Sequence, residues 1–368
     1  MSLGMAGRRR ARWLAPAVLA SALVACGGSS GGSESLHAYV VDAGDSALWQ
    51  YTIGSNAALD SMTPASVAAG AGAFQLAVDR SQGYLYVAAA GESKVLEYGI
   101  GANGALSALS PASLQIGVPD GPGQQSYAIA VDPAGPYLYL ASASDGTLTE
   151  YRIGSHGQLG AAPTPVVATP GSDPYAIAID ASGSHAYVAL ESSNCIAQYD
   201  IGSAGVLQPL TPACVSAGSQ PFRIAIDSTG RYLYATDAGA STVSQFTIGG
   251  DGRLSPMTPA SVATAPVPAG IAADPAGPYV YVANDAGTTV SQYAIGSSGA
   301  LGPLPASSAP AGSNPYGIAL DPKGRYAFVT NMGSDDVSQY RIAGDGALEP
   351  MATPTVAAGR LPAGIVVR

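Results

Sequence analysis

The feature that most constrains this chain is an internal repeat. An aromatic residue, any residue, Ile and then Gly or Ala occur in that order seven times, beginning at Tyr51, Tyr98, Tyr151, Tyr199, Phe246, Tyr293 and Tyr340. A second series, of aspartates, keeps the same spacing, at Asp79, Asp132, Asp180, Asp227, Asp274 and Asp321. Because two independent markers share one period, the chain is built from repeated supersecondary units.

Each repeat contains four short runs that are typical of strands. In the repeat that begins at Pro315 the first two runs are separated by Asp321–Gly324, whose Asp-Pro-Lys-Gly sequence is a type I turn signature. The four runs are Tyr316–Leu320, Tyr326–Thr330, Val337–Ile342 and Leu348–Val356. The chain has 47 Gly and 28 Pro among its 368 residues, and no segment shows a helical period. Four strands per repeat predict an all-β fold, a seven-bladed β-propeller of four-stranded antiparallel blades.

The two ends of the chain together supply one blade. Residues 362–367 match only the first strand of a repeat, and residues 36–69 match the other three. An open stack of repeats would leave both fragments unpaired, so we expect the ring to close with a blade shared between the N- and C-termini. Residues 36–368 then form a single propeller with six further complete blades, at about 74–116, 126–168, 174–216, 221–264, 268–309 and 315–357.

The N-terminal residues have the pattern of an export signal. A basic region at residues 8–12 precedes the apolar stretch Trp13–Ala25, which is shorter than the roughly 20 residues that a membrane-spanning helix needs. The stretch ends in Leu23–Cys26, which resembles the lipobox of bacterial lipoproteins, in which the Cys is lipidated; a chance match is the alternative. We therefore predict a signal peptide over 1–25 that is removed, and a lipidated Cys26 that begins a Gly/Ser tether over 26–35. The protein would be exported to the cell envelope and would contact the membrane through its N-terminal lipid only.

Composition excludes several classes of partner. The formal net charge is −10, which disfavours binding to nucleic acid or to an anionic membrane surface. Acidic residues occur on the predicted rim of every repeat, but no loop has calcium-binding spacing, so solvated loop charge is the preferred interpretation. The repeated aspartates are interpreted as structural, because Asp side chains bond to the backbone of their own turns. We expect a monomer with no metal and no cofactor.

The cysteines other than Cys26 form an even pair, as in proteins of oxidising compartments. Cys195 begins the third strand of its repeat and Cys214 is expected to end the fourth, with a hairpin turn at Gly202–Gly205 between them. Counting outward from that turn places the two residues opposite each other, as it places Thr242 opposite Ser261 in the next repeat. The sequence therefore predicts a disulfide across the outer edge of one blade.

Several motifs carry a resemblance to a known family. The sequences Tyr281–Asn284 (YVAN) and Phe328–Asn331 (FVTN), with Asp-Pro-x-Gly turns and Gln-Tyr-x-Ile-Gly strands, resemble the YVTN-repeat and seven-bladed lactonase propellers over essentially all of residues 36–368. That group includes 6-phosphogluconolactonases, a related cycloisomerase and exported propellers without assigned chemistry. The resemblance implies the propeller fold, and it leaves the activity open, because one fold hosts many functions.

The catalytic pattern of the family's enzymes is only partly present. Those enzymes place Pro-Arg-His at the start of an inner strand, His-Pro in the following turn and a Glu after the second strand. Here Glu191 stands where the acid is expected, and Arg223 stands one position from the expected Arg, while aromatic residues and Asp replace the other groups. If the chain is a lactonase, Glu191 and Arg223 are the candidate catalytic residues, since lactone opening needs a base and a cation near the developing oxyanion.

Aromatic residues recur near the start of the predicted inner strands. They stand five positions before each Asp marker, on the face where the central channel opens, and Ala269 and Ala363 replace them in two repeats. Together with Arg360 they are the candidate ligand-binding residues, with a platform for a sugar ring or an extended peptide as the functional interpretation and packing between blades as the alternative. The candidates are Phe74, Tyr127, Tyr175, Phe222, Tyr316 and Arg360. The extra residues 117–125 on the same face are either a functional loop or a tolerated insertion.

Two functions remain open at this point. The first is a lipid-anchored scaffold that binds a sugar, a lactone or an envelope protein at the channel mouth. The second is a lactone hydrolase, similar to 6-phosphogluconolactonase, with a diverged active site. The incomplete catalytic pattern favours the first.

Overall fold

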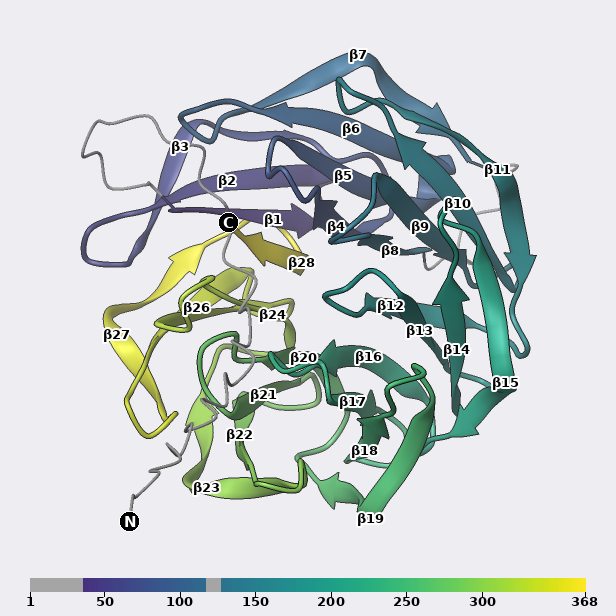
Figure 1. Ribbon diagram of the computed structural model, residues 1–368. Coiled ribbons are helices and arrows are strands. Elements are labelled where there is room, and N and C mark those ends of the chain that lie inside the picture. Colours follow the sequence, from purple (N-terminus) through teal and green to yellow (C-terminus); the bar gives the residue numbers. More distant parts are fainter. Residues whose placement is uncertain (1–35, 117–126) are drawn as a thin grey trace, which may run out of the picture. The chain divides into compact units, whose positions relative to one another are not determined.

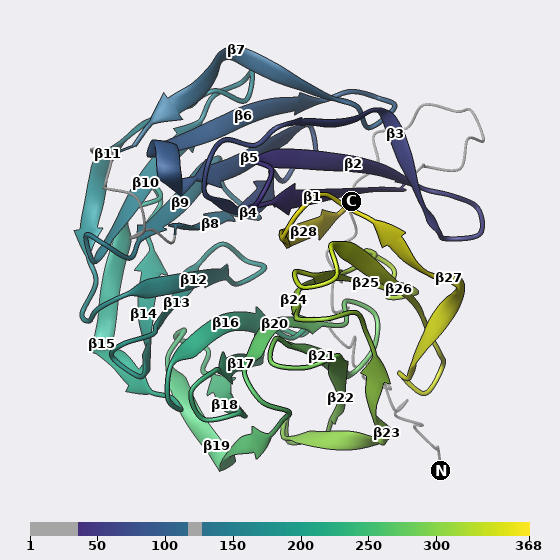
Figure 2. The same cartoon turned by 180° about the vertical axis from the view of Figure 1, so that it is seen from behind.

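A computed structural model describes residues 36–116 and 127–368, and these residues form seven four-stranded antiparallel sheets arranged in a ring. Figure 1 shows the sheets as blades around a centre, and Figure 2 shows the same ring from behind. The predicted fold class is thereby confirmed. The only helix among the described residues is a 3-10 turn, η1, at Ala90–Glu92.

Every blade is ordered from the centre outward. The inner strands are β28 (Pro362–Val367), β4 (Ala73–Val78), β8 (Tyr127–Val131), β12 (Pro174–Ile179), β16 (Pro221–Ile226), β20 (Pro268–Ala273) and β24 (Pro315–Leu320). The second strands are β1 (Leu36–Asp42), β5 (Tyr84–Ala89), β9 (Tyr137–Ser142), β13 (His185–Leu190), β17 (Tyr232–Asp237), β21 (Tyr279–Asn284) and β25 (Tyr326–Asn331). The third strands are β2 (Ala47–Ile53), β6 (Lys94–Ile100), β10 (Thr147–Ile153), β14 (Cys195–Ile201), β18 (Thr242–Ile248), β22 (Thr289–Ile295) and β26 (Asp336–Ile342). The outer strands are β3 (Leu59–Ala68), β7 (Leu106–Gln115), β11 (Leu159–Ala168), β15 (Leu207–Ser216), β19 (Leu254–Ala263), β23 (Leu301–Pro310) and β27 (Leu348–Ala357).

The ring closes through a blade built from both ends of the described chain. Strand β28 pairs with β1, and the sheet continues to β2 and β3. The backbone N–H groups of His37 and Arg368 donate to each other's carbonyl oxygens, both at 2.9 Å. The predicted shared blade is confirmed, and β28 pairs with the inner edge of β1.

Neighbouring blades are joined by two contacts that recur around the ring. A buried tyrosine of the second strand donates its hydroxyl to a glycine carbonyl in the hairpin of the next blade, at 2.6 to 2.8 Å. These tyrosines are Tyr39, Tyr86, Tyr139, Tyr187, Tyr234 and Tyr281. A buried glutamine of the third strand accepts the backbone N–H of the first outer-strand residue in the next blade, as Gln245 does from Leu301 at 2.6 Å. Both contacts bury polar groups with partners, so they fix how each blade sits on the next.

The repeated aspartates hold their own turns. Oδ1 of Asp227 accepts the backbone N–H groups of Arg231 and Tyr232, at 2.9 and 2.8 Å. Asp321 does the same with Arg325 and Tyr326. The structural interpretation of this series is therefore confirmed.

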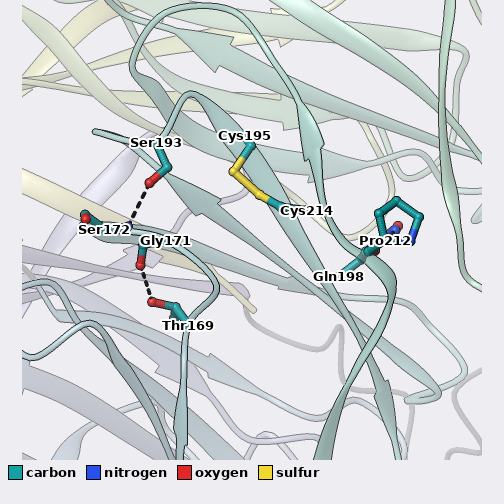
Figure 3. Close-up of a disulfide and its surroundings, with 8 residues drawn as sticks. All are labelled: Thr169, Gly171, Ser172, Ser193, Cys195, Gln198, Pro212 and Cys214. Atoms are coloured by element: carbon teal, nitrogen blue, oxygen red, sulfur yellow. Dashed lines mark hydrogen bonds between the residues drawn. A yellow bond between two sulfur atoms is a disulfide. The ribbon is translucent and has the colours of Figure 1, made fainter.

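A disulfide joins Cys195 to Cys214, as predicted, with the two Cα atoms 5.9 Å apart (Figure 3). The prediction that the two residues lie directly opposite each other is wrong. Cys195 pairs with Ser216, and Cys214 pairs with Ala197. The count from the hairpin holds as far as Tyr199, but a bulge beyond it sets extra residues of β15 against β14. The same bulge recurs in the next blade, where Thr242 pairs with Ala263 and not with Ser261.

Candidate functional site

The inner strands begin on one face of the ring, which we call the mouth face. The connections between second and third strands lie on the same face, because Asp285 N–H donates to the carbonyl of Val267, which immediately precedes β20. Near its start an inner strand shifts register against the second strand, as at Phe74 in β4 and at Tyr175 in β12. Such bulges re-aim side chains and are frequent next to binding sites.

Three aromatic rings surround the guanidinium of Arg223. Its Cζ lies 4.6 Å from the ring centroid of Phe222, 5.5 Å from that of Tyr175 and 5.6 Å from that of Tyr316. The Tyr175 and Phe222 rings are 4.4 Å apart, and Tyr316 meets Phe222 edge-on at 5.9 Å. Stacking of this kind stabilises a cation and fixes its position. We call Arg223, Tyr175, Phe222 and Tyr316 the arginine cage.

Hydrogen bonds hold the caged guanidinium in place. Nη1 of Arg223 donates to the carbonyl oxygen of Tyr175 at 3.0 Å, and Nη2 donates to the hydroxyl of Tyr316 at 3.5 Å. Burial raises the pKa of Tyr316 to about 12, so this hydroxyl is protonated at neutral pH. The guanidinium has five N–H groups, so the two bonds leave further donors for a ligand.

A cavity of about 130 Å³ opens beside the cage. Arg223 is the one charged residue in its lining, and no salt bridge to Arg223 is found within the described ranges 36–116 and 127–368. Apolar side chains, among them Leu76, Ile271 and Ile365, line other parts of it. The cavity therefore presents a positive charge that no salt bridge among the described residues compensates, which favours an anionic or carbonyl oxygen.

Gln75 belongs to the same cavity, although the sequence did not single it out. Its Nε2 donates to the carbonyl oxygen of Tyr175 at 3.3 Å, so Gln75 and Arg223 converge on one acceptor. Gln75 and Arg223 occupy the same place in their inner strands, directly after Phe74 and Phe222. Alignment of the inner strands was the signal that could have found it.

Glu191 follows β13 on the mouth face and is half-buried. Its backbone N–H donates to the carbonyl of Asp173 at 2.9 Å, and its Oε1 accepts from Nε2 of Gln220 at 3.5 Å. Burial, and secondarily the carboxylate of Asp173, raise the pKa of Glu191. Glu191 is neither in the cavity lining nor ion-paired with Arg223, so the structure does not join the two candidate catalytic residues.

The other predicted residues are placed as follows. Phe74 lines the cavity. Arg360 is exposed in the connection between β27 and β28, where its N–H donates to Oδ2 of Asp45 at 2.7 Å, and it is absent from the cavity lining. Four predicted features lie outside what the structure describes: the side chain of Tyr127, the segments 1–25 and 26–35, Cys26 within the latter, and the whole insertion at 117–125.

The described residues show neither a cluster of metal ligands nor a membrane-spanning helix. Within residues 36–116 and 127–368, no three His, Cys, Asp or Glu side chains gather as a metal site would require. The same part of the chain contains no helix that is long and apolar enough to cross a bilayer.

Comparisons with known proteins agree on one family and one fold. The family model described as "Lactonase, 7-bladed beta-propeller" matches residues 33–215 and 205–362. A search of curated proteins found no match. Among solved structures, a putative 6-phosphogluconolactonase from Bacteroides fragilis is similar with a TM-score of 0.75 and 17% identity, over 93% of this chain and 100% of that one.

A second similar structure is the periplasmic gluconolactonase of Pseudomonas aeruginosa, with a TM-score of 0.71 and 18% identity over 90% of this chain and 99% of that one. A third is a protein from Lactobacillus plantarum, with a TM-score of 0.76 and 18% identity over 91% and 99% of the two chains. Likeness at this level of identity establishes the fold and leaves the chemistry to the residues of the site.

Proposed function

This chain belongs to the lactonase family of seven-bladed β-propellers, and from that membership we propose that it is a lipid-anchored ligand-binding protein of the cell envelope that works through its mouth face. The ligand is a small molecule with a carboxylate or carbonyl oxygen, for example a lactone or a sugar acid, and it enters the cavity beside the arginine cage. An envelope protein that presents such a group at its surface would bind to the same site.

The observation that carries this proposal is the arginine cage. Arg223 is held by three rings and two hydrogen bonds, has no carboxylate partner among the described residues, and borders a cavity of about 130 Å³. A carboxylate or carbonyl oxygen would accept charge-assisted hydrogen bonds from its remaining donors. Phe74 and Tyr316 line the cavity and can contact the C–H groups of a sugar.

Binding without hydrolysis is favoured by what surrounds the cavity. Opening a lactone needs a base that activates water as well as a cation near the oxyanion. The cavity lining contains no His, Asp or Glu. The cation is therefore present without the base.

The proposed location in the cell envelope rests on different residues. A basic region, an apolar stretch and Leu23–Cys26 together support export and lipidation of Cys26. The disulfide between Cys195 and Cys214 supports an oxidising compartment. The similar gluconolactonase of Pseudomonas aeruginosa is periplasmic, which further supports an exported location for this chain.

A lactone hydrolase is the second candidate function, and one observation favours it. Glu191 stands where the family's acid is expected, and its raised pKa is typical of a carboxyl group that exchanges protons during catalysis. Hydrolysis would require a ligand that reaches from Arg223 to Glu191.

The two candidate functions are distinguished by experiments on the compact unit Ser35–Arg368. Gluconate and glucono-1,5-lactone are titrated into it by calorimetry, and lactone consumption is followed in parallel. Binding that weakens at least tenfold in Arg223→Gln, with no turnover, supports the binding protein. The matched control is Arg341→Gln, which removes an exposed arginine paired with Glu349 on the outer part of a blade. Turnover that is lost in Glu191→Gln would overturn the binding proposal and establish the hydrolase.

A further inference from the structure

The residues that immediately precede the inner strands form a rim on the mouth face, and their backbone is unusual. All six that the structure describes have positive φ, namely Gly72, Asp173, Gln220, Val267, Asn314 and Leu361. Gly, Asn and Asp adopt this left-handed conformation most readily, and β-branched residues adopt it least. Val267 (φ 51°), Leu361 (φ 53°) and Gln220 (φ 55°) are therefore the rim residues that this conformation does not favour, and Val267 and Leu361 are the two of them with apolar side chains.

Burial does not explain Val267 and Leu361 either. Their exposed fractions are 39% and 36%, and apart from Val166 they are the large apolar side chains that stand exposed in the described part of the chain. A residue that is both strained and solvent-exposed lowers stability, and such positions are retained mainly at functional sites.

The same two blades differ from the others just below the rim. Two positions after Val267 and Leu361, Ala269 and Ala363 stand where the five other blades have Phe or Tyr. The glycines that follow, Gly270 and Gly364, line the cavity. The rim is thus apolar in two of the blades whose inner strands contribute to the cavity lining.

The cavity beneath the rim has a polar and an apolar part. Arg223 and Gln75 supply hydrogen-bond donors, while Phe74 and Leu76 supply apolar surface. A purely polar ligand, such as an unsubstituted sugar acid, would leave the apolar part and the rim without a role. A ligand with an anionic head and an apolar chain would use all of these groups.

We propose that the ligand is a carboxylic acid that carries an alkyl chain, with its carboxylate on Arg223 and Gln75 and its chain directed past Val267 and Leu361. This inference rests on the proposed binding function, and it names the ligand class of that same site. The caged guanidinium selects the negative head, and the apolar rim selects the chain.

The test uses straight-chain carboxylates of increasing length, acetate, butanoate, hexanoate and octanoate, with gluconate as the polar probe and octan-1-ol as the uncharged one. They are titrated by calorimetry into the compact unit Ser35–Arg368. We expect octanoate to bind at least tenfold more tightly than acetate, because each buried methylene adds favourable transfer free energy. Octan-1-ol binds weakly, because it lacks the charge that Arg223 recognises.

Variants then assign the chain-length dependence to the rim. In the double variant Val267→Asn/Leu361→Asn the ratio between the acetate and octanoate Kd values falls to within about threefold of unity. The two changes also raise Tm, since Asn accepts positive φ, and this rise shows that the variant is folded. Val166→Asn, on the outer strand β11 with 59% exposure, is the matched control and keeps the wild-type ratio.

Each outcome has a clear meaning. Kd values that do not depend on chain length, or a dependence that survives in the rim double variant, would overturn this inference. If gluconate still binds in an Arg223-dependent way in that case, the binding function stands without it. If no carboxylate binds in an Arg223-dependent way, the inference and the proposed function fall together.

Discussion

The carboxyl group of Glu97 accepts the backbone N–H of Leu159, in the next blade, at 3.3 Å. Five other blades have glutamine at this position, and there the amide also donates to a carbonyl in the outer strand of its own blade, as Gln245 does to Pro259 at 3.1 Å. A carboxyl group can donate such a bond only when it is protonated. Glu97 and its counterpart Glu150 are almost fully buried, with exposed fractions of 1% and 0%.

The first prediction concerns stability against pH. Burial raises the pKa of Glu97 to about 7, and it raises the pKa of Glu150 as well. A carboxyl group whose pKa is higher in the folded state stabilises the fold when protonated, and this stabilisation is lost as pH rises from the unfolded pKa through the folded one. The wild type should therefore lose stability between about pH 4.5 and 7, by about 3 kcal/mol from Glu97.

Glu97→Gln removes the part of this dependence that Glu97 contributes, because the amide donates at every pH, whereas Glu150 keeps its own part. Urea unfolding at pH 5 and pH 8 measures the change, and the variant should be more stable than wild type at pH 8 and nearly equal to it at pH 5. Glu349→Gln, on an exposed outer strand, is the control and should show no such gain. A Glu97→Gln variant that is less stable at pH 8 would contradict the account.

The second prediction concerns the disulfide. The chain closes a loop of sequence separation 19 between Cys195 and Cys214, and cross-links of this size typically contribute about 3 kcal/mol. The variant Cys195→Thr/Cys214→Ser reproduces the residues of the neighbouring blade, Thr242 and Ser261, so it removes the cross-link without a foreign side chain. Its free energy of unfolding should fall by about that amount. Equal unfolding curves for variant and oxidised wild type would show that the bond does not stabilise the blade.

The third prediction concerns the contact of hairpin glycines with the preceding blade. A Cβ added at Gly346 would lie 2.3 Å from Cδ1 of Tyr279, and its φ of 84° disfavours any other residue. Gly346→Ala should therefore destabilise the fold by at least about 2 kcal/mol. Gly302→Ala, where a Cβ would meet nothing within 4 Å, should leave Tm nearly unchanged. Thermal melts of both variants test the difference.

The fourth prediction concerns ring closure. Strand β28 pairs with β1 and packs against the inner strands β24 and β4, so deleting residues 362–368 removes the closing strand and exposes the edge of β1. The truncated protein should aggregate or lose its cooperative melt. Deletion of Arg368 alone keeps all of β28 and serves as the control. A truncated chain that stays monomeric in size-exclusion chromatography, with a wild-type melt, would show that closure contributes little.

The sequence predicted the fold because every repeat carries its own signals. The Asp turns, the hairpin glycines and the aromatic markers each act within one blade, so their period predicts the number and order of strands. The register of the outer strands was harder to predict from the sequence. Counting from the hairpin failed beyond Tyr199, because a bulge between Ala197 and Tyr199 shifts the pairing of the outer strand.

The site depended on contacts that no local pattern encodes. Arg223 bonds to Tyr175, 48 residues away, and to Tyr316, 93 residues away, and these meet only because the ring closes. The aromatic series and Arg223 were both found in the sequence, but their convergence on one guanidinium was not. Arg360 was chosen for its charge, and the turn that bonds it to Asp45 holds it outside the cavity.

The joining of the chain ends at His37 and Arg368 also sets an orientation. Both residues lie where β1 begins and β28 ends, beside the β4–β5 turn, since Arg368 Nη1 donates to the carbonyl of Gln82. This is the side of the ring away from Arg223 and the rim, on which the inner strands end. The residues that precede Leu36 therefore join the ring on the face opposite the rim, so they enter it at a distance from the entrance that the rim surrounds.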